Sequence, residues 1–241
     1  MKVTNIVAQD IRFPTSKENL GTDAVHVDCD YSATYVTIET DDKNLTGIGL
    51  TFTIGKGNDL CCKSIDYFKE FIIGKEIKEI EKEILIIWEK VTNHSQLRWV
   101  GPQKGVTHIA AAAFFNAIWD LISKYHNKPL WQYIIGLETN DLLDKLSFSY
   151  LDDVISRKEA ADIINKNKKN LPKDTTTLNS TIFPAYTTAV GWLGYSDDKM
   201  SKLVKEKTDL TIMLYTGFEN SEFTKLDKEI ISYVDILIAG R

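Results

Sequence analysis

Residues 21–31 include side chains that can form hydrogen bonds with a bound molecule. Asp23 can accept hydrogen bonds from hydroxyl groups, and Tyr31 can donate one or stack on a ligand. Gly21 and Thr22 directly precede Asp23. All but Tyr31 lie within a predicted loop at residues 14–30, and loops of this length are usually functional lids or disordered segments. Two interpretations stay open: a ligand-binding lid and a solvent-exposed loop.

A second turn, FTIGKGND at residues 52–59, places Lys56 between Gly55 and Gly57. Glycines around a lysine could cradle a phosphate, although the spacing is not that of a Walker loop. The alternative is a plain turn from a strand into a helix. His108 falls on an apolar stripe of a predicted helix, which favours a packed histidine over a catalytic one.

The segment LTIMLYTG at residues 210–217 reads as a short buried strand. Neither of its alternating faces carries a cation. Tyr215 is its only ionisable group, and an unperturbed tyrosine with a pKa near ~10 is a poor base at neutral pH.

Composition indicates an ordinary globular protein of 241 residues with a net charge of -5. The acidic balance argues against a nucleic-acid partner, because phosphates need cations to neutralise them. We find no apolar window of about 18 residues and no secretory signal, so we expect no membrane span. The three cysteines, Cys29, Cys61 and Cys62, are odd in number, and two are adjacent. This pattern predicts a reducing cytoplasm, no disulfide framework and no redox role.

The first 55 residues predict three strands, the last two, SATYVTIET and LTGIGLTFT, forming an antiparallel hairpin. Helical periodicity follows, with Ile65, Phe68 and Ile72 on one face before Gly74. The isoleucines at 77, 80, 84 and 87, with Val91, continue it. The segment 105–127 predicts a long helix that is apolar on two faces and therefore buried between two layers. After about residue 140, alternating strands and helices, beginning with the strand LSFSY, predict parallel β–α–β units.

Three stretches together resemble one family: FPTSKENLGTDAVHVDCDYSATYVTIETD, LRWVGPQKGVTHIAAAAFFNAIWDLISKYHNKPLW and PAYTTAVGWLGYSDDKM. They are similar to the L-fuconate dehydratases of the enolase superfamily, in the mandelate racemase/muconate lactonizing enzyme subgroup, over roughly residues 1–206. The resemblance implies an α+β capping domain at residues 1–140 and a TIM-barrel-like segment at 141–241. It also implies that Gly21, Thr22, Asp23 and Tyr31 contact an acid sugar.

The family reaction is a Mg²⁺-assisted dehydration to a 2-keto-3-deoxy acid. In the family, a Lys-x-Lys pair on the second barrel strand supplies the base, and later strands supply the metal carboxylates and a histidine. The resemblance fails after about Glu206, where the strand LTIMLYTG replaces the one that should carry Lys-x-Lys. About 100 residues follow residue 140, and a full barrel needs about 250. We therefore predict no catalytic residue, no metal ligand and no dehydration by this chain.

Residues 207–241 are similar to part of the activating protein of anaerobic ribonucleotide reductase, a radical-SAM enzyme. That family's Cys-x3-Cys-x2-Cys motif does not occur, so no iron–sulfur site is expected. Generic parallel strands explain the segment equally well. Two functions remain open: a truncated L-fuconate dehydratase-like protein, and a non-catalytic module that uses the capping domain for interaction or homo-oligomer formation.

Overall fold

The computed structural model describes residues 1–22, 25–101, 104–169, 205, 213–216, 231–234 and 236–239. The chain divides into two compact units. The first comprises Met1–Arg12 with Ser32–Ile182, and the second comprises Phe13–Tyr31 with Phe183–Arg241. Each unit is described by itself below.

A three-stranded antiparallel sheet forms the frame of the first unit, in the order β1 (Val3–Ile11), β2 (Ser32–Thr40) and β3 (Thr46–Thr53). Ile38 pairs with Ile6 on one side and with Gly47 on the other. Val36 likewise lies between Ala8 and Gly49. These rows of side chains face the core because side chains alternate between the two faces of a sheet. The predicted hairpin is confirmed, and β1 also pairs with β2 in antiparallel fashion.

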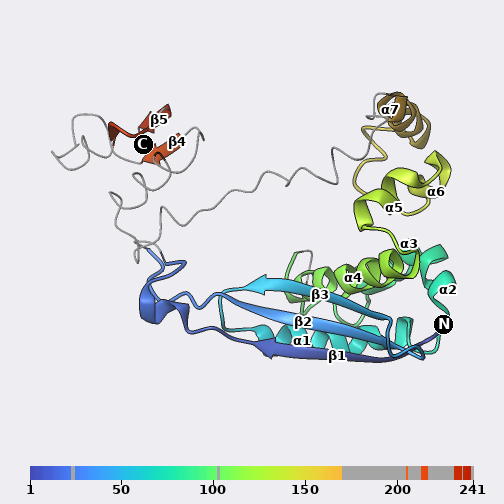
Figure 1. Ribbon diagram of the computed structural model, residues 1–241, viewed down its shortest axis with the longest axis horizontal. Coiled ribbons are helices and arrows are strands. Elements are labelled where there is room, and N and C mark those ends of the chain that lie inside the picture. The colour runs from blue at the N-terminus through green and yellow to red at the C-terminus, as the bar shows by residue number, and fades with distance from the viewer. Residues whose placement is uncertain are drawn as a thin grey trace. The chain divides into compact units, whose positions relative to one another are not determined.

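Two helices cover this inner face: α1 (Asn58–Phe68) and α4 (Val106–Tyr125). Figure 1 shows α4 running alongside β3, with α1 behind the strands. Between them lies a fully buried core in which the rings of Phe68 and Phe114 sit 5.7 Å apart. Ile65, Phe68 and Ile72 are all buried, as predicted, and Gly74 follows with a left-handed φ of 82°.

The backbone of α4 comes into direct contact with β3 at two glycines. A Cβ atom added to Gly49 would lie 2.3 Å from both the Ala113 carbonyl oxygen and the Ala117 nitrogen. One added to Gly47 would lie 2.3 Å from the Ala117 carbonyl oxygen. Real atoms do not approach so closely, so helix and strand can pack at this distance only where β3 has no side chains. The two glycines thus set the distance between helix and sheet.

The same contact places three polar side chains of α4 on the backbone of β3. The Ile48 amide donates to Asp120 Oδ2 over 2.7 Å. Asn116 Nδ2 donates to the Leu50 carbonyl over 3.3 Å, and Lys124 Nζ donates to the Thr46 carbonyl over 3.0 Å. Unpaired backbone groups on an edge strand are a template for unwanted strand pairing. In this sheet, side chains of α4 form hydrogen bonds with backbone groups along β3.

Short helices extend the first unit: η2 (Lys69–Phe71), α2 (Ile77–Lys82), α3 (Ile84–Thr92), α5 (Leu130–Gly136), α6 (Thr139–Leu143) and α7 (Arg157–Lys169). A half-buried carboxylate joins α2 to α5. Glu81 accepts a hydrogen bond from the Tyr133 hydroxyl, and His126 Nε2 lies 3.0 Å from its other oxygen. Burial raises the pKa of Glu81, but these two partners outweigh burial and leave it below the ordinary value.

Helix α4 is long and apolar enough to cross a bilayer by length and composition, so the expectation that no such segment exists was too strong. However, 61% of its apolar window is buried inside the domain, which assigns it to the core. Two apolar stripes were predicted on this helix. The first, from Val106 through Ala110, Phe114 and Leu121 to Tyr125, is mostly buried, with Ile109 exposed. On the second stripe Ala111 and Phe115 are buried and Ala112 is exposed, so two-sided burial is confirmed only in part.

The prediction of a strand at LSFSY is wrong, because residues 146–150 form turns and irregular chain. The amides of Leu151 and Asp152 both donate to the Phe148 carbonyl, which curls the backbone. A strand needs a neighbouring strand to satisfy its backbone, and no described strand pairs with these residues. In the second unit, β4 (Met213–Thr216) and β5 (Ile236–Ala239) pair in parallel, as the sequence predicted. The sequence also predicts helices at SDDKMSKLVKE (196–206) and SEFTKLDKEIISY (221–233), and these lie almost wholly outside the described residues.

Replacing Gly49 by alanine should destabilise the first unit, because the new methyl group meets backbone atoms that cannot rotate away. We expect the free energy of unfolding to fall by about 2 kcal/mol in urea denaturation. Gly136→Ala is the matched control, since no atom lies within 4 Å of its added Cβ, and it should cause no loss. Equal stability of the two variants would contradict the contact described for α4 and β3.

Candidate functional site

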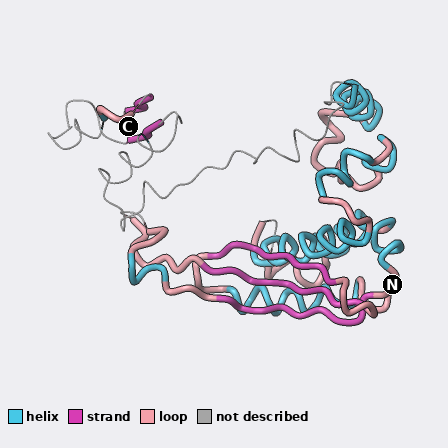
Figure 2. Tube along the Cα trace, in the orientation of Figure 1, coloured by secondary structure: helices cyan, strands magenta, loops and turns pink. Residues whose placement is uncertain are grey.

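The loop between β1 and β2 is cross-linked by its own hydrogen bonds. It begins with the short helix η1 (Thr15–Glu18), and the Leu20 amide donates to the Thr15 carbonyl over 3.0 Å. Thr15 Oγ1 accepts from the Tyr31 amide over 2.8 Å and donates to the Cys29 carbonyl. Figure 2 shows the segment as loop apart from this helix. The two limbs of the loop are therefore tied together at their base.

A serine–carboxylate pair makes a second tie. Both the amide and the hydroxyl of Ser16 donate to Asp30 Oδ1, over 3.1 and 2.7 Å. These bonds favour the charged carboxylate, so the Ser16 hydroxyl, followed by its amide, lowers the pKa of Asp30 below the ordinary value of 3.8.

Of the four predicted ligand-binding residues, the structure brings two into contact. Gly21 has a left-handed φ of 77°, and a Cβ added to it would lie 2.3 Å from the Tyr31 ring. Glycine is thus needed for both backbone and space at position 21. Thr22 is fully buried, and its hydroxyl donates to the Asn19 carbonyl over 2.9 Å. Asp23 lies outside the described residues, so the predicted ligand contacts stay a prediction.

The turn FTIGKGND contains a residue that the sequence interpretation missed. Gly55 and Gly57 take left-handed φ values of 117° and 98°, which turn the chain from β3 into α1. Asn58 then begins α1 and is fully buried in the first unit. Its Nδ2 donates to Asp10 Oδ1 over 2.9 Å and to two backbone carbonyls, while its Oδ1 accepts from Thr53. The only sequence signal was a polar residue directly after Gly-x-Gly.

Charged side chains lie at the end of β1, directly before the loop at residues 13–31 in the sequence. Arg12 donates to both oxygens of Asp10, with its Nη2 2.8 Å from Oδ2, and lies 3.6 Å from Asp59. The pKa of Asp10 falls below its ordinary value, chiefly because of Arg12 and then of Asn58. Burial alone would have raised it. The carboxylate is therefore charged and fixed at neutral pH.

Other chemically active side chains offer no second site within the described ranges. No three His, Cys, Asp or Glu side chains there are grouped to hold a metal ion. Burial raises the pKa of the Cys61 and Cys62 thiols, which makes them poor nucleophiles, and Cys61 packs in the core. His108 is half-buried, and burial lowers its pKa, as expected of a packed histidine.

Comparison with known proteins gives a consistent family. Residues 22–136 match the family model "Mandelate racemase / muconate lactonizing enzyme, N-terminal domain". The chain is 37% identical over 203 residues to human mitochondrial enolase superfamily member 1, covering 84% of this chain and 46% of that protein. It is 39% identical over 205 residues to L-galactonate dehydratase of Hypocrea jecorina, covering 85% of this chain and 45% of that enzyme.

Solved structures agree. The crystal structure of human mitochondrial enolase superfamily member 1 matches with a TM-score of 0.86 and 32% identity, over 99% of this chain and 56% of that one. L-talarate dehydratase of Polaromonas, complexed with Mg and L-glucarate, matches with a TM-score of 0.55 over 99% of this chain and 53% of that one. At 16% identity, that likeness shows the fold alone. The chain spans about half the length of the curated relatives that it matches.

The Ser16–Asp30 pair makes a pH-dependent tie in the loop. Because the folded pKa is lowered, the pair stabilises the loop above pH 3.8 and this stabilisation is lost as the pH falls through the lowered value. Ser16→Ala should move the pKa of Asp30 upward, toward 3.8, in an NMR titration of the carboxyl carbon. Ser156→Ala removes the corresponding donor to Glu159 and should leave Asp30 unchanged. An unaltered Asp30 pKa in Ser16→Ala would contradict the pairing.

Proposed function

Because the chain is a member of the enolase superfamily and carries its N-terminal α+β capping domain, we propose that it derives from an acid-sugar dehydratase of the L-fuconate type. In this proposal residues 1–140 are the capping domain, and residues 141–241 correspond to barrel sequence that diverges from about residue 207. The loop at residues 13–31 is the lid that meets the sugar. The three free cysteines favour a cytoplasmic location.

The cross-linked loop is the observation that carries the proposal. Its limbs are tied by Thr15 and Ser16, so Gly21 and Tyr31 are held against each other. A preorganised loop loses less conformational entropy when it closes on a ligand. The Tyr31 ring offers a stacking surface and a hydroxyl, which suit a polyhydroxylated acid, and Asp23 is proposed as an acceptor for its hydroxyl groups.

The substrate is proposed from the relatives. The resemblance of the sequence favours L-fuconate, and the similarity to a fungal L-galactonate dehydratase makes L-galactonate the alternative acid sugar. The superfamily implies Mg²⁺, but the described residues do not fit it, because they group no set of metal-binding side chains. We therefore assign no step of a reaction to a metal on these residues. The likeness of residues 207–241 to a radical-SAM activase carries no proposal without the cluster cysteines.

We expect the 241-residue chain to produce no 2-keto-3-deoxy acid from L-fuconate or L-galactonate, with or without Mg²⁺. The strand LTIMLYTG has no lysine where the resemblance places the base, and loss of a catalytic base costs about 10²–10⁴ in rate. The assay is incubation of pure protein with each acid and detection of the keto product. Turnover that EDTA abolishes would overturn this expectation and would show that the chain carries a working metal-dependent site.

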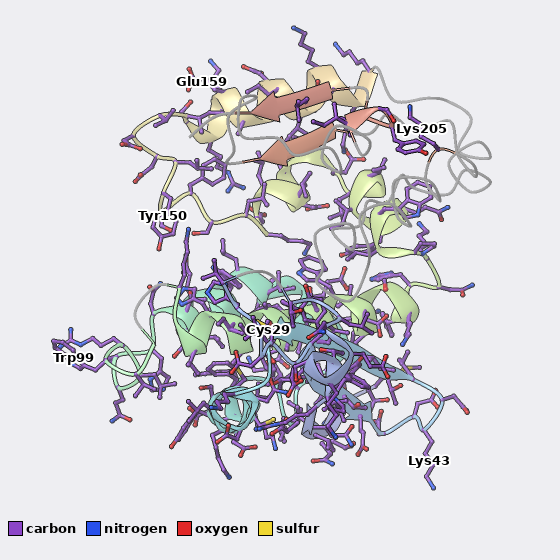
Figure 3. All side chains as sticks on the ribbon, turned by 90° about the vertical axis from the view of Figure 1, so that its left-hand side faces the viewer. Cys29, Lys43, Trp99, Tyr150, Glu159 and Lys205 are labelled. Atoms are coloured by element: carbon purple, nitrogen blue, oxygen red, sulfur yellow. The ribbon has the colours of Figure 1, made fainter. Side chains whose placement is uncertain are left out.

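A second candidate function is a non-catalytic module that self-associates, and an exposed apolar face favours it. On the outer face of the sheet, Ile48 and Leu50 are 50% and 41% exposed, beside Thr37 and Tyr35 of β2. None of these four positions carries a charge, so a second copy meets no repulsion there. Figure 3 also shows Trp99 pointing away from the rest of its unit, and it is 84% exposed.

If this face forms a homo-oligomer, Ile48→Lys/Leu50→Lys should shift the protein toward monomer in sedimentation velocity, because two buried cations oppose association. The matched control is Leu60→Lys/Tyr67→Lys, which changes two exposed apolar residues of α1 in the same way and should leave the distribution unchanged. A wild-type chain that is monomeric at high concentration would remove the second function.

A further inference from the structure

The Asn58 amide lies where two loops leave the sheet. Its Nδ2 donates to the carbonyls of both Ile11 and Ala33 over 3.3 Å, in addition to Asp10. Ile11 and Ala33 are the last pair of the β1–β2 ladder, after which the chain departs into residues 13–31. A single side chain thus bridges the strand by which the loop leaves and the strand by which it returns.

The other half of the amide reaches the third strand. Asn58 Oδ1 accepts a hydrogen bond from the hydroxyl of Thr53, the last residue of β3. The Asn58 carbonyl accepts from Thr34 Oγ1 over 3.3 Å. Both polar atoms of its side chain are therefore engaged, as the burial of an amide requires. Asn58, which begins α1, thus bonds to β1 and β3 where they end and to β2 near its start.

We propose that Asn58 is the positioning residue for the loop at residues 13–31, because it fixes the separation and orientation of the loop's two ends. The proposal rests on the function proposed above only in treating that loop as a lid. Loop closure is sensitive to how its ends are held, since fixed ends restrict the conformations that the intervening residues can sample. Loss of the amide frees the ends while β1–β2 pairing and the core of α1 and α4 stay in place.

Asparagine is the side chain that fits these partners. Aspartate has nearly the same shape but no donor, and it would bring a second carboxylate toward Asp10 and both carbonyls. The substitution therefore converts three attractions at one buried point into repulsions. Asn44→Asp makes the identical chemical change in the exposed turn between β2 and β3, at the opposite end of the sheet, and serves as the matched control.

The experiment is hydrogen–deuterium exchange of the full chain, read peptide by peptide. In Asn58→Asp, amides of residues 13–31 should exchange roughly tenfold faster, as the loss of one or two hydrogen bonds predicts, while amides of α4 stay unchanged. Asn44→Asp should match the wild type in both regions. Equal protection of residues 13–31 in Asn58→Asp and wild type would overturn the proposal, as would a uniform rise across the whole chain.

Should Asn58→Asp fail to fold, Thr53→Val gives a milder test, because it keeps the side-chain shape and removes only the hydroxyl that orients the amide. It should raise exchange in residues 13–31 by a smaller factor, and an unchanged loop would again overturn the proposal. Adding L-fuconate to the wild type tests the lid separately. Absence of protection by the sugar counts against the proposed function alone, since the variants are compared without any ligand.

Discussion

The close approach of α4 to β3 is the constraint on which the first unit depends. Gly47 and Gly49 remove the two side chains that would hold the helix away, and the alanines of α4 at 113 and 117 present backbone at the same level. The resulting packing buries the aromatic and aliphatic side chains of α1 and α4 against one face of the sheet. A small domain buries a smaller share of its surface than a large one does. Direct backbone contact lets α4 and the sheet bury as much apolar surface as possible between them.

The two ends of the sheet carry connections of very different length. At one end, the β2–β3 turn is short and polar, and Thr40 Oγ1 donates to carbonyls within it. At the other end, Asn58 bonds to all three strands, and the long loop follows β1. Such an arrangement would separate the stability of the first unit from the ligand contact proposed for the loop, since a loop can vary without altering the core.

Sequence periodicity predicted the elements whose own side chains decide their structure. The antiparallel strands and the buried isoleucines of α2 and α3 follow from spacings of two, three and four residues. The strand at LSFSY failed because a strand depends on a partner that a local pattern cannot supply. Asn58 was missed for a related reason: Ile11 and Ala33, its carbonyl partners, lie 47 and 25 residues away. Only the folded chain brings these groups to one point.

The three side chains of α4 that bond to the edge of β3 make both elements intolerant of inserted or deleted residues. Asn116, Asp120 and Lys124 are spaced four residues apart along α4, so they form one row on the helix surface. One inserted residue in α4 before position 116 would rotate that row by about 100° and remove all three from the strand together. A shift of one residue in β3 would likewise turn Gly47 and Gly49 to the opposite face. Insertions and deletions should therefore be confined to the loops and rare within α4 and β3, even where their individual side chains vary.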